Sequence, residues 1–130
     1  MSWVLVVDDS EPTREVMRDI LEMAGYSVME ADSAETAVEL LDDLRFAVLV
    51  TDIFLPGRNG LWLVREACSR GLVDRLVAVS GGGSVGGMDA LEAARIAGAD
   101  CVLKKPFSAA ALIEAARGAA AAQSSQAAAG

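Results

Sequence analysis

Short apolar runs alternate with amphipathic stretches along the chain. The most complete run, Phe46–Thr51, has six apolar or β-branched residues in a row and leads directly into Asp52. Such a run is typical of a strand that is buried on both faces, as strands of parallel sheets are. Shorter apolar runs predict four further strands, at residues 3–7, 26–31, 76–80 and 101–103.

The segments between these strands carry apolar residues three and four positions apart, which predicts five helices. The first helix is expected to bury Val16, and the third to bury Cys68. Asp32 and Glu35 have the spacing of a capping box at the start of the second helix. A strand followed by a helix, five times over, predicts an α/β fold with a parallel sheet and helices on both of its faces.

The fourth strand and the fourth helix are separated by a glycine-rich segment, Gly81–Gly87, which we expect to be a loop. The last helix begins near Ser108 and continues into sequence dominated by alanine, glutamine and serine. We therefore expect one domain over residues 1–120 and a flexible tail over residues 121–130.

Composition narrows the possible classes of protein. The apolar fraction is 53%, but no run approaches the ~20 residues of a membrane span, and no basic, apolar leader opens the chain. The net charge of −8 argues against a nucleic-acid surface. Cys68 and Cys101 lack the spacing of a metal site, and we expect both to be small buried side chains in a reducing compartment. These features favour a soluble, cytoplasmic protein.

Polar groups follow four of the five predicted strands. Because the carboxyl ends of parallel strands lie at one edge of a sheet, where ligands bind, these groups should converge. One such residue alone would often be a helix cap, whereas convergence of four strand ends indicates a site. The residues are Asp8, Asp9, Asp52, Ser80 and Lys105.

Three carboxylates at one edge need positive charge nearby. Two of them at ~4 Å repel by roughly 4 kcal/mol at an effective dielectric constant of about 20. Lys105 supplies a single positive charge, so a hard divalent cation such as Mg²⁺ is expected as well. Asp52 could then act as a nucleophile toward a phosphoryl group, since carboxylates form acyl phosphates, with Ser80 and Lys105 bonding the phosphoryl oxygens.

Five motifs in order resemble those of two-component response-regulator receiver domains. The likeness extends from about residue 3 to residue 117 and implies a flavodoxin-like, doubly wound fold with strand order 2-1-3-4-5. Each motif is weak alone, and the order and spacing of all five make the resemblance specific. The motifs are Val6–Asp9, Val50–Gly57, Ala78–Gly81, Gly98–Asp100 and Lys104–Phe107.

The resemblance implies a role for each acidic residue at the predicted edge. Asp52 matches the phosphoacceptor, which takes a phosphoryl group from a histidine kinase or a phosphotransfer protein. Asp8 and Asp9 match the acidic pair that binds Mg²⁺ together with Asp52. The main-chain carbonyl of Phe54 matches a further metal ligand. Separately, the aromatic ring of Phe54 could shield an acyl phosphate from water.

The resemblance also implies a switch, from which this sequence departs at one position. Ser80 matches the hydroxyl that turns toward the phosphoryl group, and Lys105 matches the family's lysine, followed by a cis bond to Pro106. The family usually places an aromatic residue three positions before this lysine, where this chain has Val102. We therefore hypothesise that phosphorylation orders residues 81–88 in place of rotating an aromatic ring.

The favoured interpretation is a signalling module that changes a protein-binding surface near its fourth helix and fifth strand. Its chemistry would be limited to Mg²⁺-dependent self-phosphorylation and slow self-dephosphorylation. A pseudo-receiver that only docks to partners remains an alternative, because of Val102. A haloacid-dehalogenase-type phosphohydrolase is less favoured, because such enzymes carry an Asp-x-Asp motif at the first strand. No nucleic acid or membrane is expected as a partner.

Overall fold

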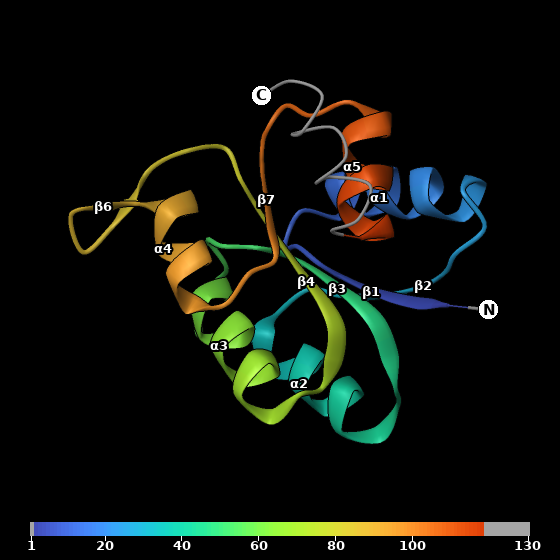
Figure 1. Cartoon of the computed structure of the whole chain (residues 1–130), viewed down its shortest axis with the longest axis horizontal. Helices are drawn as coiled ribbons and strands as arrows, with labels where there is room; N and C mark the ends of the chain where they lie inside the picture. The colour runs from blue at the N-terminus through green and yellow to red at the C-terminus, as the bar shows by residue number, and fades with distance from the viewer. Residues whose placement is uncertain (1, 119–130) are drawn as a thin grey trace.

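A computed structural model describes residues 2–118 of the chain (Figure 1). Five strands form one parallel sheet in the order β2-β1-β3-β4-β7. With β7 as the fifth strand of the sequence pattern, this is the predicted order 2-1-3-4-5. The strands are β1 (Trp3–Val7), β2 (Ser27–Ala31), β3 (Phe46–Asp52), β4 (Val73–Ser80) and β7 (Cys101–Lys104).

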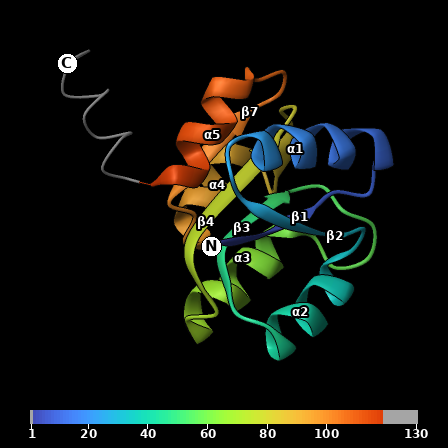
Figure 2. The same ribbon diagram turned by 90° about the vertical axis from the view of Figure 1, so that its right-hand side faces the viewer.

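Helices cover both faces of the sheet. Figures 1 and 2 show α1 and α5 together on one face, and α2 and α3 on the other. Alternate residues of β1 follow this division, since Val4 and Val6 pack with α1 and α5 while Leu5 and Val7 pack with α2 and α3. The helices are α1 (Glu11–Met23), α2 (Ala34–Asp43), α3 (Gly60–Arg70), α4 (Ala90–Ala97) and α5 (Ala109–Arg117).

Polar side chains fix where the helices next to the site begin. The hydroxyl of Ser10 caps α1, and the Asn59 side-chain oxygen accepts a hydrogen bond from the amide of Trp62 at 2.9 Å, which starts α3. The prediction that Asp32 and Glu35 form a capping box was wrong. Ser33 is the cap of α2, because its extended backbone turns the hydroxyl toward the Thr36 amide.

Two predicted core positions are exposed. Val16 is 56% exposed, because the inward stripe of α1 runs through Met17 and Leu21 instead. Cys68 is also exposed, and Ala67 takes the inward position on α3. Cys101 is partly buried, so the prediction that both cysteines lie in the core was wrong.

The glycine-rich segment contains secondary structure that the sequence pattern did not indicate. β5 (Ser84–Val85) and β6 (Met88–Asp89) pair as a short antiparallel hairpin, with Ser84 opposite Asp89. The turn between them is made by Gly86 and Gly87, both with positive φ. The expected loop is therefore a hairpin of paired strands.

Within residues 2–118, no helix has the length and apolar character needed to cross a membrane. The predicted tail, residues 121–130, and the last residues of the predicted 1–120 domain lie outside the described part of the chain.

Candidate functional site

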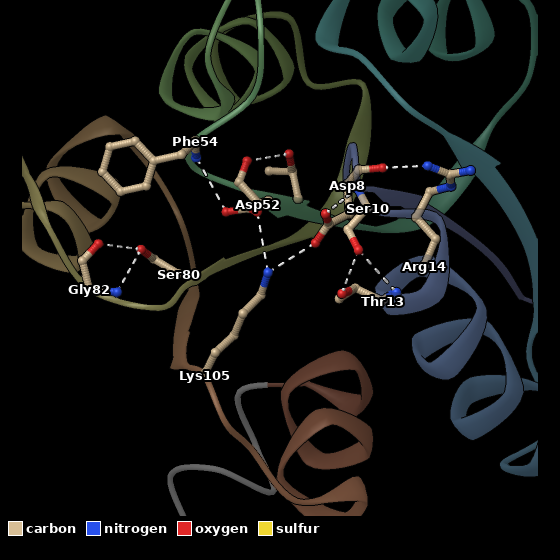
Figure 3. A network of polar contacts seen from close by, with 10 residues as sticks. Asp8, Ser10, Thr13, Arg14, Asp52, Phe54, Ser80, Gly82 and Lys105 are labelled. Carbon is tan, nitrogen blue, oxygen red and sulfur yellow. Dashed lines mark hydrogen bonds and ion pairs between the residues drawn. The ribbon is translucent and has the colours of Figure 1, made fainter.

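The carboxyl edge of the sheet brings two buried aspartates to one lysine (Figure 3). Asp8 follows β1, Asp52 ends β3, and Lys105 follows β7. The Lys105 ammonium lies 3.0 Å from Asp8 Oδ2 and 3.2 Å from Asp52 Oδ2. The Lys105–Pro106 bond is cis, as predicted. Residues far apart in the sequence thus meet because β1, β3 and β7 are parallel strands of one sheet and end at the same edge.

Backbone amides hold the second oxygen of each buried carboxylate. The Ser10 amide donates to Asp8 Oδ1 at 2.9 Å, and the Phe54 amide donates to Asp52 Oδ1 at 3.2 Å. The hydroxyl of Thr51 donates to the backbone oxygen of Asp52 at 2.9 Å. Both side chains are therefore fixed before any ligand arrives, which favours a site with a defined geometry.

The third predicted carboxylate completes an acidic cluster. Asp8, Asp9 and Asp52 each offer a carboxylate oxygen, and these oxygens lie within 4.8 Å of one another. Asp8 and Asp52 are buried, whereas Asp9 is exposed and can reach solvent. An all-oxygen set of two or three carboxylates, with one open side, fits a hard divalent cation that keeps some of its water.

The environment of the site shifts the pKa of both Asp52 and Lys105. Burial raises the pKa of Asp52, and the negative charge of Asp8 adds to this, while Lys105 and the Phe54 amide oppose it without cancelling it. Burial lowers the pKa of Lys105, but the hydrogen bond to Asp8 and the charges of both aspartates outweigh burial and raise it overall. Lys105 is therefore charged at neutral pH, and its one charge does not fully offset the desolvation of Asp52.

Ser80 lies at the end of β4 but turns away from Asp52 in this structure (Figure 3). Its hydroxyl donates to the Gly82 carbonyl at 2.9 Å and accepts from the Gly82 amide at 3.1 Å. A group on Asp52 would therefore have to compete with this local turn for the hydroxyl.

The loop after Asp52 contacts the glycine-rich segment. Phe54 is 44% exposed, and its ring lies against Gly83, where a Cβ atom would come within 3.1 Å of the ring. The Gly83 carbonyl in turn accepts a hydrogen bond from the amide of Ala90, the first residue of α4. Val102 is partly buried and packs with Ile53 and neighbouring core residues beneath α4. Gly83 thus links the aromatic ring of Phe54 to the start of α4.

Two residues that support the site were missed at the level of sequence. Arg14 donates from Nη1 to the backbone carbonyl of Asp8 at 2.7 Å. Gly60 donates its amide to the Ile53 carbonyl at 2.8 Å, and its Cα faces the Asp52 carbonyl so closely that a Cβ would lie 1.9 Å from that oxygen. A glycine in the first turn of a helix is a signal for such a close approach, whereas nothing in the sequence marks Arg14.

Residues 4–117 match the family model of the response regulator receiver domain. The transcriptional regulatory protein FixJ of Azorhizobium caulinodans is 36% identical over 114 residues, which cover 88% of this chain and 53% of FixJ. The aerobic respiration control protein ArcA of Escherichia coli K12 is 33% identical over 80% of this chain and 42% of ArcA. The chain spans about half the length of these relatives.

Two solved structures have the same fold. A response regulator protein from Burkholderia pseudomallei, with a phosphorylated aspartic acid, a calcium ion and citrate, superposes with a TM-score of 0.81 at 26% identity; the match covers 97% of this chain and 72% of that one. FixJ-N superposes with a TM-score of 0.79 at 32% identity, covering 90% of this chain and 91% of that one.

Proposed function

Because the chain belongs to the response regulator receiver domain family, we propose that it is a phosphorylation-switched signal receiver with Asp52 as phosphoacceptor. The observation that carries this proposal is the convergence of Asp8, Asp9, Asp52 and Lys105 at one edge of the sheet. The family match and the phosphorylated aspartic acid in the Burkholderia structure support it.

In the proposed reaction, a carboxylate oxygen of Asp52 attacks the phosphorus of a phosphohistidine on a kinase or phosphotransfer protein. A phosphorus–oxygen bond forms, the phosphorus–nitrogen bond breaks, and the histidine leaves and takes up a proton. The Phe54 amide and Lys105 hold Asp52 in position for this step. Self-phosphorylation and slow self-dephosphorylation are the only reactions that we propose for the chain.

The metal site proposed for this reaction takes Mg²⁺. Asp8, Asp9 and Asp52, with the main-chain carbonyl of Phe54, would hold the cation. When bound, Mg²⁺ would offset the negative charge that gathers on the transferred phosphoryl group. The calcium ion in the Burkholderia structure supports a divalent cation in such a domain, and Mg²⁺ is our choice from the all-oxygen donor set.

The proposed output is a change in the surface around α4 and β7. A phosphoryl group on Asp52 offers acceptor oxygens for Ser80, whose hydroxyl would leave Gly82 to reach them. Movement at Gly82 passes to Gly83, which contacts both the Phe54 ring and the first amide of α4. The proposed partners are a kinase upstream and another protein downstream.

Phosphoryl transfer can be tested by intact mass spectrometry after incubation with Mg²⁺ and acetyl phosphate. The wild-type protein is expected to gain a single phosphoryl adduct that requires Mg²⁺. Asp52→Asn should gain none, because the amide is not a nucleophile. Asp43→Asn is the matched control, since Asp43 is an exposed aspartate at the end of α2 and should leave the adduct unchanged.

An adduct on Asp52→Asn would contradict Asp52 as the acceptor. Absence of an adduct on the wild-type protein, both from acetyl phosphate and from phosphorylated histidine kinases, would contradict the proposed function and favour a pseudo-receiver. Continuous release of phosphate from small phosphomonoesters, lost in Asp52→Asn, would instead indicate a phosphohydrolase.

The Phe54 ring is expected to slow the loss of the phosphoryl group. Phe54 bonds Asp52 through its backbone amide, and its ring would limit where water can approach an acyl phosphate on that carboxylate. Phe54→Ser should shorten the half-life of the phosphorylated protein several-fold, measured as adduct decay after the donor is removed. Phe54→Leu keeps apolar bulk at the same place and should change the half-life less. Equal half-lives for wild type and Phe54→Ser would show that the ring gives no protection.

A further inference from the structure

The backbone next to Asp9 is held by an arginine from α1. Arg14 Nη1 donates to the Asp8 carbonyl at 2.7 Å, and the Arg14 side chain is only 14% exposed (Figure 3). This carbonyl belongs to the peptide group that joins Asp8 to Asp9. The contact therefore fixes the orientation of the peptide from which the Asp9 side chain projects.

Arg14 is itself held in place by an ion pair with Glu30. Its Nε lies 3.2 Å from Glu30 Oε1 on the edge strand β2, and the other oxygen of Glu30 lies 2.7 Å from Arg18 Nη1. Glu30 is opposite Val6, the residue before the last of β1, in the parallel pairing of β1 with β2. The guanidinium thus ties the β1–α1 connection to the edge of the sheet.

Among the three clustered carboxylates, Asp9 depends most on its backbone. Asp8 is held by the Ser10 amide and Lys105, and Asp52 by the Phe54 amide and Lys105. No side-chain or backbone donor within residues 2–118 bonds the exposed carboxylate of Asp9. Its position relative to the other two carboxylates is therefore set by the peptide that Arg14 holds.

We infer that Arg14 is a positioning residue for divalent-cation binding at Asp8, Asp9 and Asp52, an inference that rests on the metal site of the proposed function. Two effects of Arg14 on a cation have opposite signs. Its positive charge near the cluster repels a cation, so removal of the charge alone would strengthen binding. Its hold on the Asp8–Asp9 peptide preorganises the ligands, so removal of the hydrogen bond would weaken binding.

The opposite signs make the test decisive. Isothermal titration of the metal-free protein with Mg²⁺ would compare wild type with Arg14→Met, which keeps the length of the side chain but removes both the charge and the donors. We expect Arg14→Met to bind Mg²⁺ about tenfold more weakly, as expected when a group that orients metal ligands is lost. Unchanged or tighter binding by a folded Arg14→Met protein would overturn the inference.

Arg18→Met is the matched control. It removes the same charge from the same helix and the same acidic partner, Glu30, but Arg18 makes no contact with Asp8. Its Mg²⁺ affinity should equal or exceed that of the wild type. A loss in Arg18→Met equal to that in Arg14→Met would show that the Glu30 network, and not the bond to Asp8, controls the affinity.

Thermal unfolding without metal would show whether Arg14→Met folds. If it does not, Arg14→Lys, which keeps the positive charge, serves as the test variant. A single ammonium cannot reproduce the fork that reaches both Glu30 and the Asp8 carbonyl, so its affinity should fall between those of wild type and Arg14→Met. A Mg²⁺ affinity of Arg14→Lys equal to that of wild type would contradict the inference that the two contacts of the guanidinium position the metal ligands. Absence of Mg²⁺ binding in the wild type would instead overturn the metal site of the proposed function, and the inference with it.

Discussion

Replacing Gly60 by alanine is expected to lower the free energy of unfolding by about 3 kcal/mol or more, at the upper end of the usual cost of forcing extra atoms into a packed site. The added Cβ would lie 1.9 Å from the Asp52 carbonyl oxygen and 2.8 Å from the Ile53 Cα. Both neighbours are backbone atoms, so no side chain can rotate to make room.

The strain would act directly on Asp52, the proposed phosphoacceptor. The Gly60 amide bonds the Ile53 carbonyl at 2.8 Å and so closes the loop that runs from Asp52 to the start of α3. Relief of the clash requires either α3 or the Asp52 peptide to move. Urea denaturation should show the loss of stability, and the folded fraction of Gly60→Ala should form the acetyl phosphate adduct more slowly than wild type.

Gly81→Ala is the matched control for this change. A Cβ at Gly81 would meet nothing within 4 Å, and its φ lies outside the left-handed region. Its stability should stay within about 0.5 kcal/mol of wild type, as for other substitutions without a packing consequence. Equal urea midpoints for Gly60→Ala and Gly81→Ala would show that the β3–α3 loop yields to the extra methyl group.

The strands themselves were predictable because burial on two faces leaves a strong mark on sequence, whereas their order in the sheet was implied by the resemblance to receiver domains. Continuous apolar runs such as Phe46–Thr51 have few alternative structures, and glycines such as Gly71 mark helix ends through their left-handed backbone. Structural details that depend on contacts between elements were harder to predict from the sequence. The predicted inward position of Cys68 was wrong, because the rotation of a helix about its axis is set by the elements packed against it. The hairpin in the glycine-rich segment was missed, because glycine has no side-chain pattern to read.

The site was also predictable in part. The proximity of Asp52 and Lys105 could be predicted from the sequence, because parallel topology places the carboxyl ends of all strands at one edge. The supporting contacts could not, because they join backbone to side chain across elements. Arg14 reaches a main-chain carbonyl, which no residue type encodes, and the Ser80 hydroxyl bonds the backbone of Gly82.

The charge of Asp52 is expected to destabilise the metal-free protein, so Asp52→Asn should melt several degrees higher than wild type at neutral pH. The pKa of Asp52 is raised in the folded state, chiefly by burial, above its usual value of 3.8. A carboxyl group with a raised folded pKa stabilises the fold while it is protonated, at a pH below the unfolded value. That stability is lost as the pH rises through the folded pKa. An unfavourable buried charge of this kind is typical of residues whose role is functional.

The pH dependence separates this effect from a change in packing. The difference in melting temperature between Asp52→Asn and wild type should be large at neutral pH, shrink as the pH falls through the raised folded pKa of Asp52, and be lost by about pH 3.8. Mg²⁺ should also reduce it at neutral pH, because a cation bound by the wild type stabilises the folded state. Asp43→Asn, the exposed control, should show neither trend. A lower melting temperature for Asp52→Asn at neutral pH would mean that the ion pair with Lys105, at 3.2 Å, outweighs the cost of burying the carboxylate.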